Sequence, residues 1–549
     1  MTLPAVILFP LLGGLLAWAA GWRSEASARR VALVAAALQC VLVAALALRL
    51  RLAPMADAAS PWLAEARMPW IPQLGASMHL AVDGLSLTLL LLTAFLGFVA
   101  VLVSEGGSDR RGGAFQLCLM SALAAVSGVF LAVDLLLFFV FFEAMLVPVY
   151  FLMVLWGDAR ADRQGAALKF FLFTQASGLL MLFSALSLSF FKMRLTGQFT
   201  MDATELGDVR VMGLAAWTLP LGFLLAFAVK LPLVPLHSWQ PPAYAAVPAS
   251  GGIILSGVMA KVGAYGMLRF LLPLFPEASG KLAPWVMGLA LLGIVYGALA
   301  AFAQTDLRRF IAWSSINHLG FIVLGIFSLN GLGQRGAVVL MIAHGCSVAG
   351  LFVLSAVMER NGERDMTRLG GMWAATPRLG AFAMLIMMAT LGLPGLANFV
   401  GEFLVLLGLF HSAPCIAVPA AVATVLSAAY ALRFMQQVFF GAPGKTKPAA
   451  ELSGRHALAA LILALALVIL GLFPAPLLGA LDSAPITATP ERVSLGAPIS
   501  RLADGKHATP EGQSGDWRAQ EGPLTRNSVD AASCRVAGET PPSSQGGLP

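Results

Sequence analysis

The sequence predicts an all-α polytopic membrane protein, and three observations support that fold class. Of the 549 residues, 58% are hydrophobic and only 11% are charged, whereas a soluble domain carries roughly 25% charged residues. Apolar runs of about 20 residues, the length of a membrane-spanning helix, recur along most of the chain. These runs lack the period-two alternation of barrel strands. We therefore expect helices whose backbones satisfy their own hydrogen bonds.

The length of the apolar runs predicts roughly fourteen membrane spans. The first run, MTLPAVILFPLLGGLLAWAAGW, has no basic segment before it, so we expect a retained first helix and no cleaved signal peptide. Residues 483–549 differ in kind, because they are rich in Pro, Gly, Ser, Thr and charged residues and have no apolar periodicity. We expect this tail to be disordered.

Basic residues gather in the odd-numbered loops between these spans. Loops of this kind carry, among others, Arg23, Arg29, Arg110, Arg160, Arg163, Arg308, Arg364 and Arg455. The positive-inside rule places such loops in the cytoplasm and therefore predicts that both termini lie outside.

The cysteines argue against a redox centre in this chain. Five are present, at Cys40, Cys118, Cys346, Cys415 and Cys534, without CxxC or CxxxH spacing. Iron–sulfur, zinc and haem sites need closely spaced ligands. No phosphate-binding loop is visible either. We therefore expect no cofactor, no metal site and no redox active site within the chain itself.

Six ionisable residues lie deep in the apolar runs, where a charge is expensive and usually marks an ion path. They are Glu143, Lys230, Lys261, His318, His344 and Glu402. Glu143 follows the polar edge at Asp134 by nine residues. That spacing corresponds to about 13 Å of helix rise, close to the midplane of a core about 30 Å thick.

Simpler interpretations exist for each of these residues. The glutamates and lysines could form static buried ion pairs, although such pairs stabilise proteins poorly. The histidines could be ordinary interhelical hydrogen-bond partners. Basic residues near span ends usually extend their charge toward the interface. We assign that structural role to Lys169, Lys192, Arg269 and Arg433.

Two of the spans are interrupted, and the interruptions correspond. Lys230 comes just before a break at Pro232, and Glu402 comes just after a break at Leu393-Pro394-Gly395. Proline removes a backbone donor and clashes with the preceding turn. Paired broken helices at corresponding positions are typical of transporters built from inverted repeats, with their sites near the membrane midplane.

Several segments resemble a known family. FFEAMLVPVYFLMVLWG, FAVKLPLVPLHSW, GVMAKVGAYGMLRF, QTDLRRFIAWSSINHLGF and LGLPGLANFVGEF occur in order and are similar to the proton-conducting, antiporter-like family of respiratory complex I. The resemblance covers about residues 1–481. It implies helices 1–3 in 1–112, inverted five-helix repeats in 113–272 and 273–441, and a final helix in 442–482. Glu402 resembles the M-type members, since L-type members typically carry lysine there.

The resemblance implies a proton-translocating subunit of NADH:quinone oxidoreductase in the bacterial inner membrane. Flavin, iron–sulfur clusters and quinone would belong to partner subunits, and neighbouring antiporter-like subunits would be membrane partners. No nucleic acid is implied. Alternatives are a subunit of a multi-subunit cation/proton antiporter or membrane-bound hydrogenase, and a membrane scaffold without a conducting role. The segment HSWQPPAYAAVP departs from the family by lacking its usual acidic residue and histidine. That departure argues against an ionic anchor between this loop and a neighbour.

Charge exchange along the membrane plane is the predicted mechanism. Burial disfavours the charged form of a side chain, whereas an opposite charge nearby favours it. A Glu143–Lys230 pair would therefore keep both residues charged, and separating them would release the Lys230 proton toward Lys261. Histidine changes charge near neutral pH. His318 and His344 could therefore relay the proton to Glu402.

Overall fold

The computed structural model describes residues 2–52, 62–105, 111–444 and 450–481. The predicted tail at 483–549 lies outside them. Within the described residues, twelve helices are long and apolar enough to cross a membrane. Two further spans are split into shorter helices, at α9 (Ala215–Lys230) and at α18 (Pro377–Thr390) with α19 (Ala397–Ser412). The prediction of an all-α polytopic membrane protein is confirmed.

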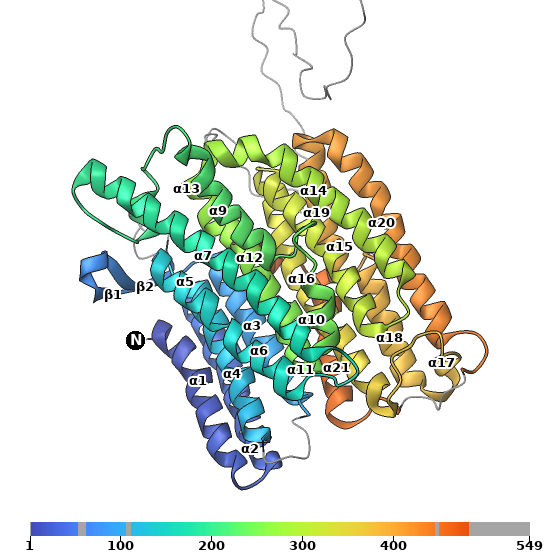
Figure 1. Cartoon of the computed structure of the whole chain (residues 1–549). Coiled ribbons are helices and arrows are strands. Elements are labelled where there is room, and N and C mark those ends of the chain that lie inside the picture. The colour runs from blue at the N-terminus through green and yellow to red at the C-terminus, as the bar shows by residue number, and fades with distance from the viewer. Residues whose placement is uncertain (1, 53–61, 106–110, 445–449, 482–549) are drawn as a thin grey trace, which may run out of the picture. The chain divides into compact units, whose positions relative to one another are not determined.

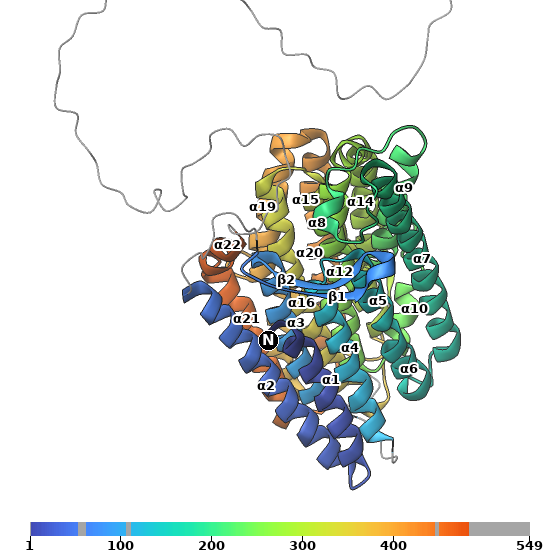
Figure 2. The ribbon, with the colours of Figure 1, turned by 90° about the vertical axis from the view of Figure 1, so that its left-hand side faces the viewer.

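The N-terminal part contains a β-hairpin that the helical pattern did not predict. Its elements are α1 (Thr2–Gly21), α2 (Glu25–Leu52), β1 (Ala64–Ile71), the 3₁₀ turn η1 (Pro72–Leu74), β2 (Ala76–Val82), α3 (Gly84–Leu102) and α4 (Gly112–Leu131). The strands pair antiparallel, with Ala66 opposite Leu80. Gly75 closes the turn at a φ of +53°, a conformation that glycine adopts readily. Figure 2 shows the hairpin running across the helices.

Polar contacts hold the hairpin in place. The buried His79 lies between two carboxylates, with Nδ1 2.6 Å from Asp202 Oδ2 and Nε2 2.9 Å from Glu65 Oε1. Burial alone would lower the pKa of His79, but the hydrogen bond and charge of Asp202 outweigh it and raise that pKa. Burial likewise opposes ionisation of Asp202, yet His79 and Thr204 lower its pKa to about 2.

The middle of the chain includes the first broken span. Its elements are α5 (Leu135–Ala144), α6 (Leu146–Trp156), α7 (Arg163–Thr196), α8 (Ala203–Leu206), α9, α10 (Gln240–Ala246), α11 (Ala249–Ile254), the π-helix η2 (Leu255–Met259), α12 (Ala260–Gly266), the π-helix η3 (Met267–Leu271) and α13 (Leu272–Leu274). Helix α9 ends at Lys230, two residues before Pro232, as the sequence predicted. The chain from Ala249 to Leu274 forms one span that is fully enclosed by other helices.

The remaining helices complete the bundle. They are α14 (Pro276–Ala303), α15 (Leu307–Phe327), α16 (Gly331–Met358), the 3₁₀ turn η4 (Glu359–Asn361), α17 (Met372–Ala375), α18, α19, α20 (Pro414–Phe434), the π-helix η5 (Met435–Phe439), α21 (Gly454–Leu472) and α22 (Ala475–Leu481). The central parts of α15 and α16 are almost entirely buried, whereas only 33% of the most apolar part of α20 is buried. Figure 1 shows α1 and α20 on opposite sides, with α12 and α16 between them.

Candidate functional site

The first two predicted residues, Glu143 and Lys230, each lie near the C-terminal end of a helix. Glu143 is the next-to-last residue of α5, and Lys230 is the last residue of α9. A cation at a helix C-terminus is favoured by the helix dipole. Lys230 is only 2% exposed, so this polar group lies inside the protein and not at an interface.

Neither residue has a hydrogen-bond partner among the described residues. Both carboxylate oxygens of Glu143 and the Nζ of Lys230 are buried without one. The Lys230 ammonium lies over the face of the Phe142 ring, 4.5 Å from its centroid, which is a cation–π contact. The direct Glu143–Lys230 ion pair that the sequence suggested is therefore not made in this structure. The ammonium contacts the aromatic face directly, and Glu143 acts on it as a nearby charge without a hydrogen bond.

A glycine on the neighbouring helix makes room for Glu143. A Cβ built on Gly178 of α7 would lie 1.7 Å from Glu143 Oε1, far closer than van der Waals contact allows. Gly178 therefore has a specific steric role. Any side chain at position 178 would force the carboxylate to move.

The second group of predicted residues forms direct contacts. Lys261 lies on α12 between the π-helices η2 and η3, and such π-turns occur frequently at functional sites. Its Nζ is 2.6 Å from the Ser256 carbonyl oxygen and 2.8 Å from His344 Nδ1. The ammonium donates to both, since a carbonyl oxygen and an unprotonated ring nitrogen are acceptors. Both Lys261 and His344 are buried.

His318 connects this contact to Glu402. The rings of His344 and His318 lie with their centroids 5.5 Å apart. His318 Nδ1 is 3.2 Å from Glu402 Oε1. These residues come from α16, α15 and α19, so with Lys261 on α12 four helices contribute to the series. Lys261, His344, His318 and Glu402 thus lie in series, and we name them the relay. The two ends are hydrogen-bonded, whereas the two histidines are neighbours through their rings, with His344 Nε2 buried and without a hydrogen-bond partner in the described part of the chain.

The second broken span accommodates Glu402 through a glycine. The chain between α18 and α19 turns at Gly392, which has a φ of +77°. A Cβ on Gly392 would lie 2.6 Å from Glu402 Oε2. The loop therefore needs glycine both for its backbone conformation and for the space that the carboxylate occupies. The predicted break at 393–395 is confirmed, because α18 ends at Thr390 and α19 begins at Ala397.

Within the described residues, no hydrogen bond or ion pair joins Lys230 to Lys261. The backbones between them pack tightly, since a Cβ on Gly263 would lie 2.5 Å from the Phe227 carbonyl oxygen. Trp239 donates its indole N–H to the Val229 carbonyl at 2.9 Å and fixes the end of α9. The six predicted residues thus divide into an unpartnered pair, Glu143 and Lys230, and the relay.

The loop containing HSWQPPAYAAVP is anchored by arginines from elsewhere in the chain. Arg308 donates to the Val247 carbonyl at 2.6 Å, and Arg364 donates to the Ala245 carbonyl at 3.1 Å. The expectation that this loop has no ionic anchor to a neighbour stays a prediction, since these bonds come from the same chain and reach backbone oxygens. The anchors are charged, but they bind backbone oxygens, which no substitution in the loop removes.

Those arginines belong to a charged network around a cavity of about 350 Å³. Arg364 pairs with Asp158 at 2.9 Å and with Asp306 at 3.1 Å. Partial burial opposes ionisation of Asp158, but hydrogen bonds from Arg160 and the charge of Arg364 prevail and hold the pKa of Asp158 well below its usual range. The network keeps this end of the broken span in place.

One basic residue makes an ion pair inside the protein, and one contact of the relay was not predicted. Arg269 was assigned a structural role, and its side chain is 9% exposed and pairs with Asp83 at 2.6 Å. Asp83 is the N-cap of α3, so the arginine reaches a helix end and is paired there. Tyr430, which contacts His318, was missed because a tyrosine in an apolar run resembles ordinary core. The polar residue Ser427, one helical turn earlier, could have indicated a polar face of α20.

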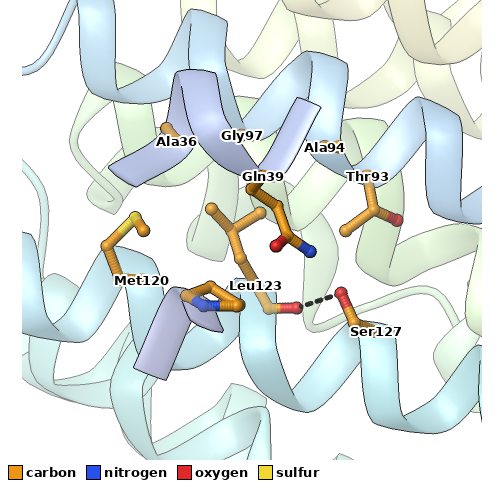
Figure 3. A pocket seen from close by; sticks show the side chains of 9 residues that line it. Ala36, Gln39, Thr93, Ala94, Gly97, Met120, Leu123 and Ser127 are labelled. Atoms are coloured by element: carbon orange, nitrogen blue, oxygen red, sulfur yellow. Dashed lines mark hydrogen bonds between the residues drawn. The ribbon is translucent and has the colours of Figure 1, made fainter. Parts of the chain in front are cut away.

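The small cavity drawn in Figure 3 is not a ligand site. It lies among α1 to α4 and has a volume of about 10 Å³, which suffices for roughly one water. Gln39 donates to the Val6 carbonyl at 2.9 Å, and Ser127 donates to the Leu123 carbonyl at 2.9 Å. None of the six predicted residues lines this cavity. Within the described parts of the chain, no group of three His, Cys, Asp or Glu residues is arranged to hold a metal.

Comparison with known proteins gives concordant matches. The family model described as NADH:quinone oxidoreductase/Mrp antiporter, TM, matches residues 132–427. NADH-quinone oxidoreductase subunit M of Pseudomonas aeruginosa is 44% identical over 92% of this chain and 100% of that protein. The Escherichia coli K12 protein of the same name is 44% identical over 88% of this chain and 97% of its own length.

Solved structures agree with this match. A chain of respiratory complex I from Thermus thermophilus is 32% identical and covers 89% of this chain and 100% of that chain, with a TM-score of 0.77. A chain of the Mrp complex from Dietzia, at 22% identity, covers 89% of this chain and 52% of its own, with a TM-score of 0.75. The latter similarity concerns the fold alone.

Proposed function

Because this chain belongs to the family of NADH:quinone oxidoreductase and Mrp antiporter membrane subunits, within its subunit M group, we propose a specific proton path for it. Glu143 and Lys230 act as an electrostatic switch, and the relay from Lys261 to Glu402 carries the proton. The observation that supports this proposal best is the pair of hydrogen bonds Lys261–His344 and His318–Glu402, whose two histidine rings are neighbours.

The relay has the chemistry that proton transfer needs. Lys261 is a donor, His344 Nδ1 accepts from it, and His318 contacts the carboxylate of Glu402. Histidine passes protons because it donates and accepts through two different ring nitrogens. In a low-dielectric interior these groups interact strongly. A change of charge on Lys261 therefore acts on the whole relay.

The switch differs from the relay because its two charged groups make no hydrogen bonds to any described residue. Glu143 and Lys230 lack hydrogen-bond partners that would fix their charge states. A charge change at Glu143, imposed by a neighbouring subunit, then alters how firmly Lys230 holds its proton. Glu143 is the input residue, Lys230 the responding residue, and Lys261 the first acceptor in the relay. Glu402 is the terminal group that releases the proton.

The rest of the machinery belongs to other subunits in this proposal. The chain works in the bacterial inner membrane with both termini on the periplasmic side. Flavin, iron–sulfur clusters and quinone are held by partner subunits, and antiporter-like subunits lie next to it in the membrane. A role in a cation/proton antiporter is less well supported, because the relatives at 44% identity are named as subunit M of NADH-quinone oxidoreductase.

The test replaces each switch residue in the intact complex. Glu143→Gln and Lys230→Ala should each reduce the number of protons pumped per NADH oxidised by roughly tenfold or more, while the complex still assembles. Proton uptake by vesicles, normalised to assembled complex, measures this ratio. A normal ratio in both variants would contradict the switch. Mass spectrometry of the co-purifying subunits identifies the assembly, since an antiporter complex would lack flavin and iron–sulfur proteins.

A further inference from the structure

His318 has a second partner that the relay does not include. While Nδ1 faces Glu402, Nε2 lies 3.1 Å from the hydroxyl of Tyr430. Tyr430 comes from α20 and is completely buried. Its ring packs edge-on against Phe310, with 5.8 Å between the centroids. Both nitrogens of the central histidine are therefore in contact with side chains that can share a proton.

The orientation of a neighbouring amide limits what the tyrosine can do. Asn317 Nδ2 lies 2.8 Å from the Ile294 carbonyl oxygen, which only accepts hydrogen bonds. That contact assigns Nδ2 as the donor and leaves Oδ1 as an acceptor. Ser427 donates to this oxygen at 2.9 Å, and the Tyr430 hydroxyl lies 3.5 Å from it. Tyr430 thus has two acceptors within reach, His318 Nε2 and Asn317 Oδ1.

This arrangement serves both charge states of His318. When the ring is neutral and donates from Nδ1 to Glu402, Nε2 accepts the Tyr430 proton. When the ring is protonated, Nε2 donates to the Tyr430 oxygen, and the hydroxyl proton turns toward Asn317. No buried polar group loses its partner in either state, which avoids a substantial free-energy cost.

We infer that Tyr430 is a positioning residue for the relay, a hydroxyl rotor that lets His318 gain and lose a proton without reorganising the helices. The inference rests on the proposed function, because it assumes that His318 changes charge. The titratable groups that face His318 are Glu402 on α19, His344 on α16 and Tyr430 on α20, with Lys261 behind His344.

Tyr430→Phe is the sharpest test, because it keeps the ring that packs on Phe310 and removes only the oxygen. Leaving a charged donor unpaired costs more than leaving a neutral acceptor unpaired, so the variant should disfavour protonated His318. The number of protons pumped per electron would be measured against pH in intact complex reconstituted into vesicles. The fall of this ratio on the alkaline side, the alkaline limb, should move to lower pH by about one unit. Tyr296→Phe is the matched control and should leave the profile unchanged, since Tyr296 is 44% exposed.

A second variant shows whether the effect passes through His318. In a His318→Gln background, Tyr430→Phe should produce no further shift, because interacting sites are non-additive. A Tyr430→Phe profile superimposable on the wild type, with His318→Gln impaired, would overturn this inference alone. Normal pumping in His318→Gln would instead overturn the proposed function.

A third variant keeps the inference testable if Tyr430→Phe does not assemble. If Tyr430→Phe lowers the yield of assembled complex, 3-fluorotyrosine at position 430 keeps the hydroxyl and nearly the same shape. Fluorination makes the hydroxyl a stronger donor and a weaker acceptor. The alkaline limb should then move in the same direction by a smaller amount, and no movement would count against the rotor.

Discussion

The switch and the relay are built from similar residue types but in opposite ways. In the switch, Glu143 and Lys230 have no hydrogen-bond partners, and an aromatic ring receives the ammonium. In the relay, Lys261 and Glu402 each contact a histidine directly. An unpartnered buried charge is expensive and responds to any change in nearby charge. In the proposed function the partnered groups carry the proton, and the pair without hydrogen bonds responds to a change in nearby charge.

The largest expected loss of pumping comes from removing Lys261, the first residue of the relay. Lys261→Ala removes the donor to His344 and to the Ser256 carbonyl at once. We expect pumping per NADH to fall roughly tenfold or more, with assembly retained. Lys169→Ala is the control, because Lys169 lies over Phe173 and makes no contact with the relay. Equal pumping in the two variants would contradict the role of Lys261.

A second prediction exchanges the terminal group. Glu402→Lys should retain severalfold more pumping than Glu402→Ala, because a lysine can still take and release a proton and related L-type subunits resemble that arrangement. The measurement is the proton-per-electron ratio of both variants. Equal loss in the two would mean that the terminal position needs a carboxylate, for example to orient His318.

Steric substitutions sharpen the comparison further. Gly178→Ala should displace Glu143 and lower pumping severalfold, since the new Cβ would lie 1.7 Å from Oε1. Gly288→Ala is the matched control on α14, because no atom lies within 4 Å of its Cβ position. Unchanged pumping in Gly178→Ala would mean that the position of Glu143 does not matter.

The equivalent test on the relay uses the second broken span. Gly392→Ala should disturb Glu402 and also strain the backbone, which costs about 1–3 kcal/mol for a residue held in such a conformation. Gly395→Ala shares the positive φ, but the nearest atom to its Cβ is 3.9 Å away. Both variants should lose stability in thermal unfolding, and only Gly392→Ala should lose pumping out of proportion.

The smallest effect concerns the β-hairpin, outside the switch and the relay. The raised pKa of His79 means that protonated His79 contributes stability below its unfolded value of about 6.5. This contribution is lost as the pH rises through the folded value. Backbone amides of β2 should therefore exchange with solvent more slowly, after correction for intrinsic rates, at pH 6 than at pH 9. His79→Gln should abolish the difference, and a difference that persists would exclude His79 as its cause.

The sequence was sufficient for the fold class and for the positions of the two helix breaks. Long apolar runs predict helices, and prolines predict their breaks. The end of α9 at Lys230 and the start of α19 at Ala397 agree with this pattern. Side-chain pairing was less predictable. The contact between the Lys230 ammonium and the Phe142 ring was not predicted, because no pattern of spacing reveals which neighbours a buried lysine touches.

The anchors of the loop and the contact between Tyr430 and His318 were also not predicted. The anchoring of the HSWQPPAYAAVP loop depends on backbone carbonyls, which every sequence possesses. Tyr430 lies more than a hundred positions from His318 in the chain, and only the packing of α20 on α15 brings the two together. The inverted repeat at 113–272 and 273–441 stays a prediction.

A double-substitution cycle on the switch tests the central claim most directly. The proton-per-electron ratio would be measured for Glu143→Gln, Lys230→Ala and the combined variant in assembled complex. If the two residues act as one unit, the combined variant should pump no worse than the weaker single variant. Losses that multiply would mean that Glu143 and Lys230 act independently, and the switch would then not exist.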